Sequence, residues 1–192
     1  SIGTPLIGMS QDGLAAFEPA FADELAEIMA WAFGYLQKDG SGDPDERTWL
    51  RDETGGSVYL RLSTNPIEQP GKRADDLWQQ GAVDGAYWLR PPGPNCEVVI
   101  AYQGVIASEA IKAAGELAEH RRDVGVLAVT SADRLNAGWT AAQRARARGQ
   151  ANAQSHVERL LGELSPHCSL VTVIDGHPAT LSWLGAVGGH KT

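Results

Sequence analysis

Residues 97–130 have the sequence EVVIAYQGVIASEAIKAAGELAEHRRDVGVLAVT, and this stretch decides the fold class. It contains an apolar run at 97–102, a helical pattern at 108–120 and a second apolar run at 124–130. Near-continuous apolar runs are typical of strands buried on both faces, and the order strand, helix, strand is the signature of a right-handed crossover unit. The stretch therefore predicts an α/β fold with a mostly parallel sheet.

The same alternation continues toward the C-terminus. We expect helices at 133–148 and 155–164, a strand at 170–174, and a further helix that begins at Pro178 and contains Ser182. This order predicts a three-layer α/β/α arrangement, with helices on both faces of the sheet.

The first third of the chain has another pattern. An apolar stripe at helical spacing, which includes Phe33 and Leu36, predicts an amphipathic helix over residues 19–36 with Pro19 in its first turn. The polar residues 38–46 that follow are expected to form an exposed loop. A short strand is expected at 58–63, because these residues are strand formers between turn signals.

Composition excludes several classes of protein. The chain has 192 residues, 43% hydrophobic and 21% charged, with a mean hydropathy of -0.23, as in soluble globular domains. Sixteen Lys and Arg against 24 Asp and Glu give a net charge of -8, which opposes nucleic-acid binding. No run of 18 apolar residues and no signal peptide is present, so neither membrane spanning nor secretion is expected.

Two cysteines, Cys96 and Cys168, lie far apart in the sequence without other Cys or His at metal-ligand spacing. This arrangement indicates neither a disulfide framework nor a zinc site. We therefore expect a reducing, cytoplasmic location.

Candidate functional residues follow the predicted strands, because ligands of open parallel sheets bind beyond the carboxyl ends of the strands. The segments at these positions are 103–104, 131–133 and 175–177. Asp175 and His177, with Ser182 downstream, are the candidate ligand or interface residues. A Ser-His-Asp hydrolase lacks support, because no G-x-S-x-G elbow is present, and a turn with a helix-capping His177 is favoured.

Arg144, Arg146 and Arg148 alternate with alanine, which spreads their charges over more than one helix face. A solvated helix end with favourable charge near its C-terminus is the favoured interpretation. Docking of an acidic partner is the alternative.

Several stretches resemble a known enzyme family in collinear order. Residues 17–29 and 58–70 resemble a late helix and the last strand of the pyrimidine-binding domain in the homodimeric pyruvate dehydrogenase first component. Residues 85–90 and 175–185 resemble the opening and a late strand–helix junction of the transketolase-type C-terminal domain in the same enzymes. The match is closest to a bacterial subgroup labelled transketolase or 2-oxo acid dehydrogenase.

The resemblance implies a division of the chain. Residues 1–66 would be the last part of the pyrimidine-binding domain, 67–85 a linker, and 86–192 a C-terminal domain without its final strand and helix. Both ends are expected to be cuts in a longer protein.

The resemblance also implies a thiamine diphosphate and Mg²⁺ enzyme that is a homodimer, with a dihydrolipoyl acyltransferase core as a possible partner. No catalytic, cofactor-binding or metal-binding residue of the family matches a position here. Asp39-Gly40 with Asn65 differs from the family's diphosphate segment, because Lys38 stands where the first Gly should be and a helix precedes it. The fragment is therefore expected to support dimerisation and active-site architecture, with no cofactor or catalysis of its own.

An alternative from another class stays open. The chain could be a stand-alone α/β module that binds a small anion, or regulates, through the crevice near residues 175–177. The length of the open reading frame would discriminate the two.

Overall fold

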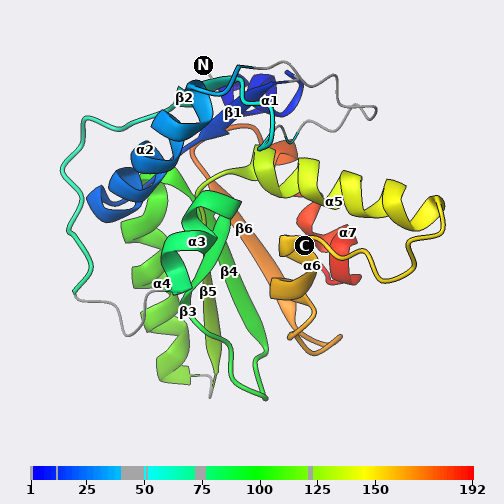
Figure 1. Ribbon diagram of the computed structural model, residues 1–192. Helices are drawn as coiled ribbons and strands as arrows, with labels where there is room; N and C mark the ends of the chain where they lie inside the picture. Colours follow the sequence, from blue (N-terminus) through cyan, green and yellow to red (C-terminus); the bar gives the residue numbers. More distant parts are fainter. Residues whose placement is uncertain (1, 12, 40–49, 51, 72–76, 121–122) are drawn as a thin grey trace.

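The computed structural model describes residues 2–11, 13–39, 50, 52–71, 77–120 and 123–192 (Figure 1). Its main layer is a four-stranded sheet with the order β3-β5-β4-β6. The central strands β5 (Val124–Val129) and β4 (Val98–Gln103) and the edge strand β6 (Ser169–Ile174) are parallel, whereas β3 (Ala86–Arg90) runs antiparallel to β5. The predicted mostly parallel sheet is confirmed.

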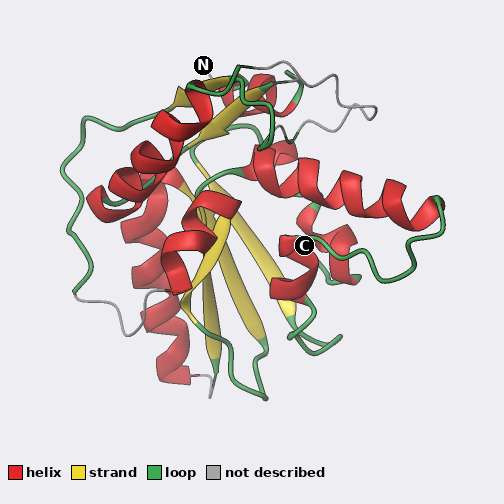
Figure 2. Cartoon of the chain, viewed as in Figure 1, coloured by secondary structure: helices red, strands yellow, loops and turns green. Residues whose placement is uncertain are grey.

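Helices lie on both faces of this sheet, as Figure 2 shows. After the 3-10 turn η1 (Gly104–Ile106), α4 (Ala107–His120) packs on one face, against Ile100 and Val126. α5 (Ala132–Ala147), α6 (His156–Leu161) and α7 (Leu184–Gly188) pack on the other face, where Val99 and Leu127 are fully buried. The three-layer α/β/α prediction is therefore confirmed.

A second, two-stranded sheet lies beyond the carboxyl ends of the first (Figure 1). Its parallel strands β1 (Leu14–Phe17) and β2 (Ser57–Leu60) pair from Leu14 with Ser57 to Phe17 with Leu60. α1 (Thr4–Met9) precedes β1, and α2 (Ala22–Leu36) follows it.

The N-terminus of α2 is fixed by a buried carboxylate. Glu24 Oε2 accepts hydrogen bonds from the backbone N–H groups of Ala20 at 2.7 Å and Phe21 at 2.9 Å. Glu24 Oε1 accepts one from the Tyr87 hydroxyl of β3 at 2.6 Å. Glu24 thus satisfies two helix-terminal donors and ties α2 to the larger sheet. The predicted helix is confirmed, although Pro19 lies before its first turn, because this capping begins the helix at Ala22.

Other expected boundaries differ from the structure. The predicted strand 58–63 ends at Leu60, and four helices and strands were not predicted: α1, β1, α3 (Leu77–Asp84) and β3. α3 lies inside the expected linker 67–85. Residues 40–46 of the predicted loop 38–46 lie outside the described residues.

The helix expected from Pro178 is interrupted. Pro178–Thr180 forms the short 3-10 helix η2, and α7 begins only at Leu184. The Trp183 indole donates to the Thr180 carbonyl at 2.8 Å, and Leu184 N donates to Leu181 O, so the chain turns instead of continuing as an α-helix. Ser182 therefore lies between two helices.

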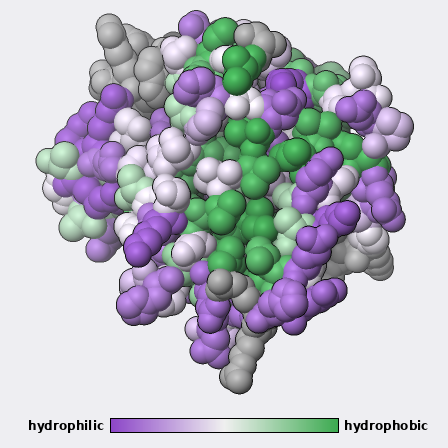
Figure 3. Space-filling model, turned by 180° about the vertical axis from the view of Figure 1, so that it is seen from behind, coloured by the Kyte–Doolittle hydropathy of each residue, from purple (hydrophilic) through white to green (hydrophobic). Residues whose placement is uncertain are grey.

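α4 covers its face of the sheet only in part. Figure 3 shows this side of the molecule, with a band of apolar side chains down its middle. Val171 of β6 pairs with Ile100 on this face and is 46% exposed. Within the described ranges, no helix is both long and apolar enough to cross a membrane.

The two cysteines meet at the amino ends of β4 and β6. Cys96 and Cys168 are both buried and form no disulfide, and their sulfur atoms are 3.9 Å apart. Their separation in the sequence did not indicate this contact. Burial, together with the charge and hydrogen bond of Cys96, raises the pKa of Cys168 to about 12.

Because the thiolate is the reactive form, we expect the Cys168 thiol of the folded protein to resist iodoacetamide at about pH 8. Unfolding in urea should restore the reactivity of an ordinary thiol. Peptide mass spectrometry after timed alkylation measures both rates, and native alkylation of Cys168 as fast as in urea would contradict the burial described here.

Candidate functional site

The parallel strands of the two sheets face each other with their carboxyl ends and form one polar junction. Glu18 follows β1, Arg61 follows β2, Gln103 ends β4 and Asp175 follows β6. This is where ligands of open parallel sheets bind. Here side chains of the smaller sheet occupy that position.

Arg61 spans the junction. Its Nη1 donates to Glu18 Oε1 at 2.8 Å and to the Asp175 carbonyl at 2.9 Å, and its Nη2 donates to Asp175 Oδ2 at 3.2 Å. Burial alone would lower the pKa of Arg61, but the hydrogen bonds and charges of Glu18 and Asp175 raise it. The guanidinium therefore stays charged and links the ends of β1, β2 and β6.

Gln103 extends the network into the larger sheet. Its Nε2 donates to Glu18 Oε2 at 3.1 Å, and its Oε1 accepts from Ala132 N at 3.2 Å. Gly104, directly after it, has φ of +70°, and a Cβ there would lie 3.0 Å from Glu18 Oε2. A side chain at this position would strain the backbone and crowd the buried carboxylate.

Three further hydrogen bonds join β1 to the segment that begins α5. Glu18 N donates to Thr130 O at 2.7 Å, the Ser131 hydroxyl donates to Ala16 O at 2.6 Å, and Ala16 N donates to Asp133 Oδ2 at 3.0 Å. β1 is thereby fixed to the start of α5. The two sheets are held by the chain's own polar groups at the place where an open sheet would accept a ligand.

Asp133, at the start of α5, has a pKa well above the usual value of an aspartate. It is buried, and burial raises its pKa from 3.8 to about 7, although the Ala16 N–H and the charge of Arg134 oppose the rise. Its protonation state therefore changes near neutral pH.

A cavity of about 250 Å³ opens beside Arg61. Its walls include Pro19, Ser63, Asn65 and Val105. Its charged lining residues are Arg61, Glu18 and Asp175, so the two carboxylates outnumber the one cation. This balance does not favour a small anion.

The structure places the three candidate residues from the sequence in different surroundings. Asp175 belongs to the junction, with its side chain 63% exposed. The His177 Nδ1 accepts from Ala179 N at 3.2 Å and caps η2, as the favoured interpretation predicted. Ser182 lies beyond that turn, and in the described part of the chain no hydrogen bond joins these three side chains into a triad.

Glu18 and Arg61 were missed by sequence reasoning. β1 carried no recognisable strand pattern, so Glu18 did not appear as a strand-end residue, and Arg61 was placed inside a predicted strand. A charged residue directly after a short apolar run was the signal that the sequence offered.

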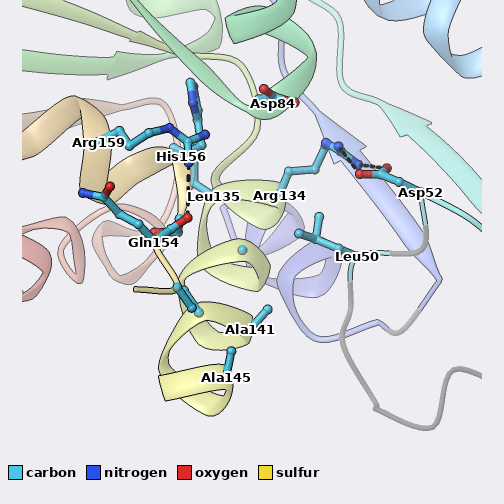
Figure 4. Close-up of a pocket in the computed structure, with 14 residues that line it drawn as sticks. Leu50, Asp52, Asp84, Arg134, Leu135, Ala141, Ala145, Gln154, His156 and Arg159 are labelled. Atoms are coloured by element: carbon cyan, nitrogen blue, oxygen red, sulfur yellow. Dashed lines mark hydrogen bonds and ion pairs between the residues drawn. The ribbon is translucent and has the colours of Figure 1, made fainter. Parts of the chain in front are cut away.

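A second cavity, of about 500 Å³, lies between α5, α6 and the side chains of Leu50 and Asp52 (Figure 4). Ala141 and Ala145 form its floor. Arg134 makes a bidentate ion pair with Asp52 at 2.9 and 3.0 Å and lies 4.6 Å from the centre of the Trp31 ring. The charge of Arg134 is thus matched by the chain itself.

At the arginine-rich C-terminal end of α5, Arg146 makes hydrogen bonds within the chain. Arg146 donates to Glu158 Oε1 and to Ala153 O, both at 2.7 Å. Burial would raise the pKa of Glu158, but bonds from Arg146 and Ser155 lower it. Arg146 therefore holds α5 to α6. Over the residues that the structure describes, no group of three His, Cys, Asp or Glu could hold a metal ion.

We expect the change Arg61→Met to destabilise the protein by about 1–3 kcal/mol, because the buried Glu18 carboxylate loses its ion-pair partner. The exposed Arg90, at the end of β3, provides a matched control, and Arg90→Met should change stability by less than about 0.5 kcal/mol. Urea unfolding measures both variants. Equal losses would show that Arg61 contributes only surface charge.

Asp133 gives the protein a pH dependence with a defined sign. Its folded pKa of about 7 lies above its unfolded value of 3.8, so the folded state binds the extra proton and stability falls as pH rises between these values. Asp133→Asn should flatten this slope, because it removes the carboxyl that titrates, while the amide oxygen can still accept from Ala16 N. Unfolding free energies at about pH 5 and about pH 8 test this, and an unchanged slope in the variant would contradict it.

Comparison with solved structures identifies proteins of similar fold. No protein-family model and no curated protein sequence matches the chain. A transketolase variant from Pichia stipitis in complex with fructose 6-phosphate is 16% identical, with a TM-score of 0.62 over 95% of this chain and 21% of that one. The transketolase of Leishmania mexicana is 15% identical, with a TM-score of 0.56 over the same shares.

The chain thus spans about a fifth of the length of these transketolases. At such identities the likeness concerns the fold alone. The chain has the fold of a transketolase segment that includes its C-terminal domain.

Proposed function

We propose that the chain is the C-terminal portion of a thiamine diphosphate-dependent enzyme, either a 2-oxo acid dehydrogenase of the pyruvate dehydrogenase type or a transketolase. Its own task is to hold the end of a pyrimidine-binding domain, residues 1–66, against a C-terminal domain, residues 86–192. The fold supports the family, and the Arg61 junction is the single observation that carries the task. Residues 67–85, which include α3, connect the two parts.

The residues described here do not fit the cofactor's metal diphosphate. They hold no cluster of carboxylates suited to Mg²⁺, and Asp39 is preceded by Lys38 where the diphosphate segment has its first glycine. When bound, thiamine diphosphate supplies the electron sink for cleavage next to a carbonyl. In this proposal other parts of the enzyme bind it, and no catalytic residue is assigned to this chain.

The contribution of this chain is positional. Strand ends carry the binding groups of α/β enzymes, and small displacements there cost large factors in rate. Glu18, Gln103 and Arg61 fix the ends of β1 and β2 by charged and buried hydrogen bonds. The junction therefore supports the active-site architecture of the intact enzyme.

The proposal also covers the assembly, location and partner of the intact enzyme. The intact enzyme would be a homodimer in the cytoplasm, where its cysteines stay reduced. The residues at 144–148 could meet a dihydrolipoyl acyltransferase core, although Arg146 already binds Glu158. Asp175 acts as an interface residue, and His177 as a cap.

The stand-alone anion-binding module receives less support. Its crevice at residues 175–177 is filled by Arg61, and the adjacent cavity has more negative than positive groups. An anion would have to displace Asp175 from the guanidinium.

We expect the isolated 192 residues to show no decarboxylation of pyruvate with thiamine diphosphate and Mg²⁺, whereas the intact enzyme turns over its substrate. Carbon dioxide release measured for both proteins at equal concentration tests this. Cofactor-dependent turnover by the isolated chain would sink the proposal that catalysis resides elsewhere.

A further inference from the structure

Cys96 and Cys168 occupy equivalent positions at the amino ends of two neighbouring strands. Cys96 closes a β-turn before β4, because its N–H donates to the Gly93 carbonyl at 3.2 Å. Cys168 closes a second turn before β6, because its N–H donates to the Ser165 carbonyl at 2.9 Å. Since β4 and β6 pair in the sheet, the two turns lie side by side, at the end opposite the Arg61 junction (Figure 1).

The two thiols are in contact. The Cys168 thiol donates to Sγ of Cys96 at 3.9 Å, and the Cys96 thiol donates to the Val98 carbonyl at 3.3 Å. Neighbouring strands lie about 4.8 Å apart, inside the range of about 4.4–6.8 Å that disulfides span between Cα atoms. Rotation of the two side chains can therefore close the gap of roughly 2 Å that separates this contact from a disulfide bond.

Both thiols lie directly beneath the surface, but at different depths. Cys96 is 5% and Cys168 1% exposed. Asn95 and Glu97, on either side of Cys96, are exposed, so a local movement of the turn admits a molecule as small as a peroxide. Cys168 is held as the thiol by its high pKa. Cys96 is therefore the residue that meets an oxidant first.

We propose that Cys96 and Cys168 are a thiol pair that a hydroperoxide oxidises to an intrachain disulfide. Sγ of Cys96 attacks one peroxide oxygen, the O–O bond breaks, and the thiol proton leaves with the other oxygen, so that Cys96 becomes a sulfenic acid. Sγ of Cys168 then attacks the sulfur of Cys96, the S–O bond breaks, and the hydroxide that leaves takes the second thiol proton as water. The peroxide gains the two electrons that the two thiols lose.

Contact between the sulfurs makes the second step favourable in spite of the low thiolate fraction of Cys168, because the attack occurs within one chain. In a reducing compartment both thiols stay free, and the disulfide forms when peroxide is present. This chemistry is independent of the proposed function, because it uses neither the cofactor nor the Arg61 junction.

The disulfide fixes the edge of the larger sheet. β6 is an edge strand, joined to the sheet through β4. The bond links positions 72 apart and closes a loop that contains α4, β5, α5 and α6. A cross-link over a loop of this length restricts the unfolded chain and stabilises the folded one. Arg61 at the carboxyl end and the disulfide at the amino end then hold β6 at both ends.

Treatment of the folded 192-residue chain with hydrogen peroxide tests the pairing. After maleimide labelling in denaturant, mass spectrometry should show the loss of two hydrogen atoms and no labelled thiol, and peptide mapping should find Cys96 joined to Cys168. Sulfinic acids on both residues without a cross-link, or a disulfide between two chains, would overturn the proposal.

Thermal unfolding measures the effect of the bond. The oxidised chain should unfold about 5–15 °C above the reduced chain, and dithiothreitol should abolish the difference. An oxidised chain with an unchanged or lower midpoint would contradict the role assigned to the disulfide at the sheet edge.

Two single-cysteine variants test the order of attack. In Cys168→Ala, peroxide together with dimedone, which traps sulfenic acids, should label Cys96, because the second thiol is missing. In the matched variant Cys96→Ala, Cys168 should stay unlabelled, because its thiol is buried and protonated. Circular dichroism confirms that both variants are folded. Labelling of Cys168 as fast as that of Cys96 would overturn the assignment of Cys96 as the attacking residue.

Discussion

The placement of Arg61 between Glu18 and Asp175 is the constraint on which the rest of the structure depends. It closes the crevice at the carboxyl ends of the parallel strands, where an α/β sheet would otherwise accept a ligand. The carboxylate of Glu18 is almost fully buried, and the guanidinium of Arg61 pairs with its charge. Gln103 donates a hydrogen bond to its second oxygen. These bonds join the two sheets at their carboxyl ends.

The three parallel strands of the larger sheet could be predicted from the sequence, because apolar runs such as 98–102 and 124–129 have few alternatives to buried strands. β1 could not be, since its four residues are half alanine and depend on pairing with β2. The contact of Arg61 with Asp175 joins positions 114 apart and exists only in the folded chain. Helical spacing likewise grouped Phe33 with buried residues, because periodicity does not tell which apolar residues face the core.

These features fit one account of the chain as a supporting part of a larger enzyme. Its polar groups at the strand ends are satisfied internally, by Arg61 and by the start of α5. Its exposed apolar side chains lie on α2 and on the edge strand β6. Under the proposed function, the contribution of this chain is to assembly and to the positioning of its strand ends.

Differential scanning calorimetry of the isolated chain tests the central claim that the junction makes the two sheets one cooperative unit. We predict a single transition in which the calorimetric and van't Hoff enthalpies agree. Two separate transitions, with the β1 and β2 region unfolding before the four-stranded sheet, would contradict it.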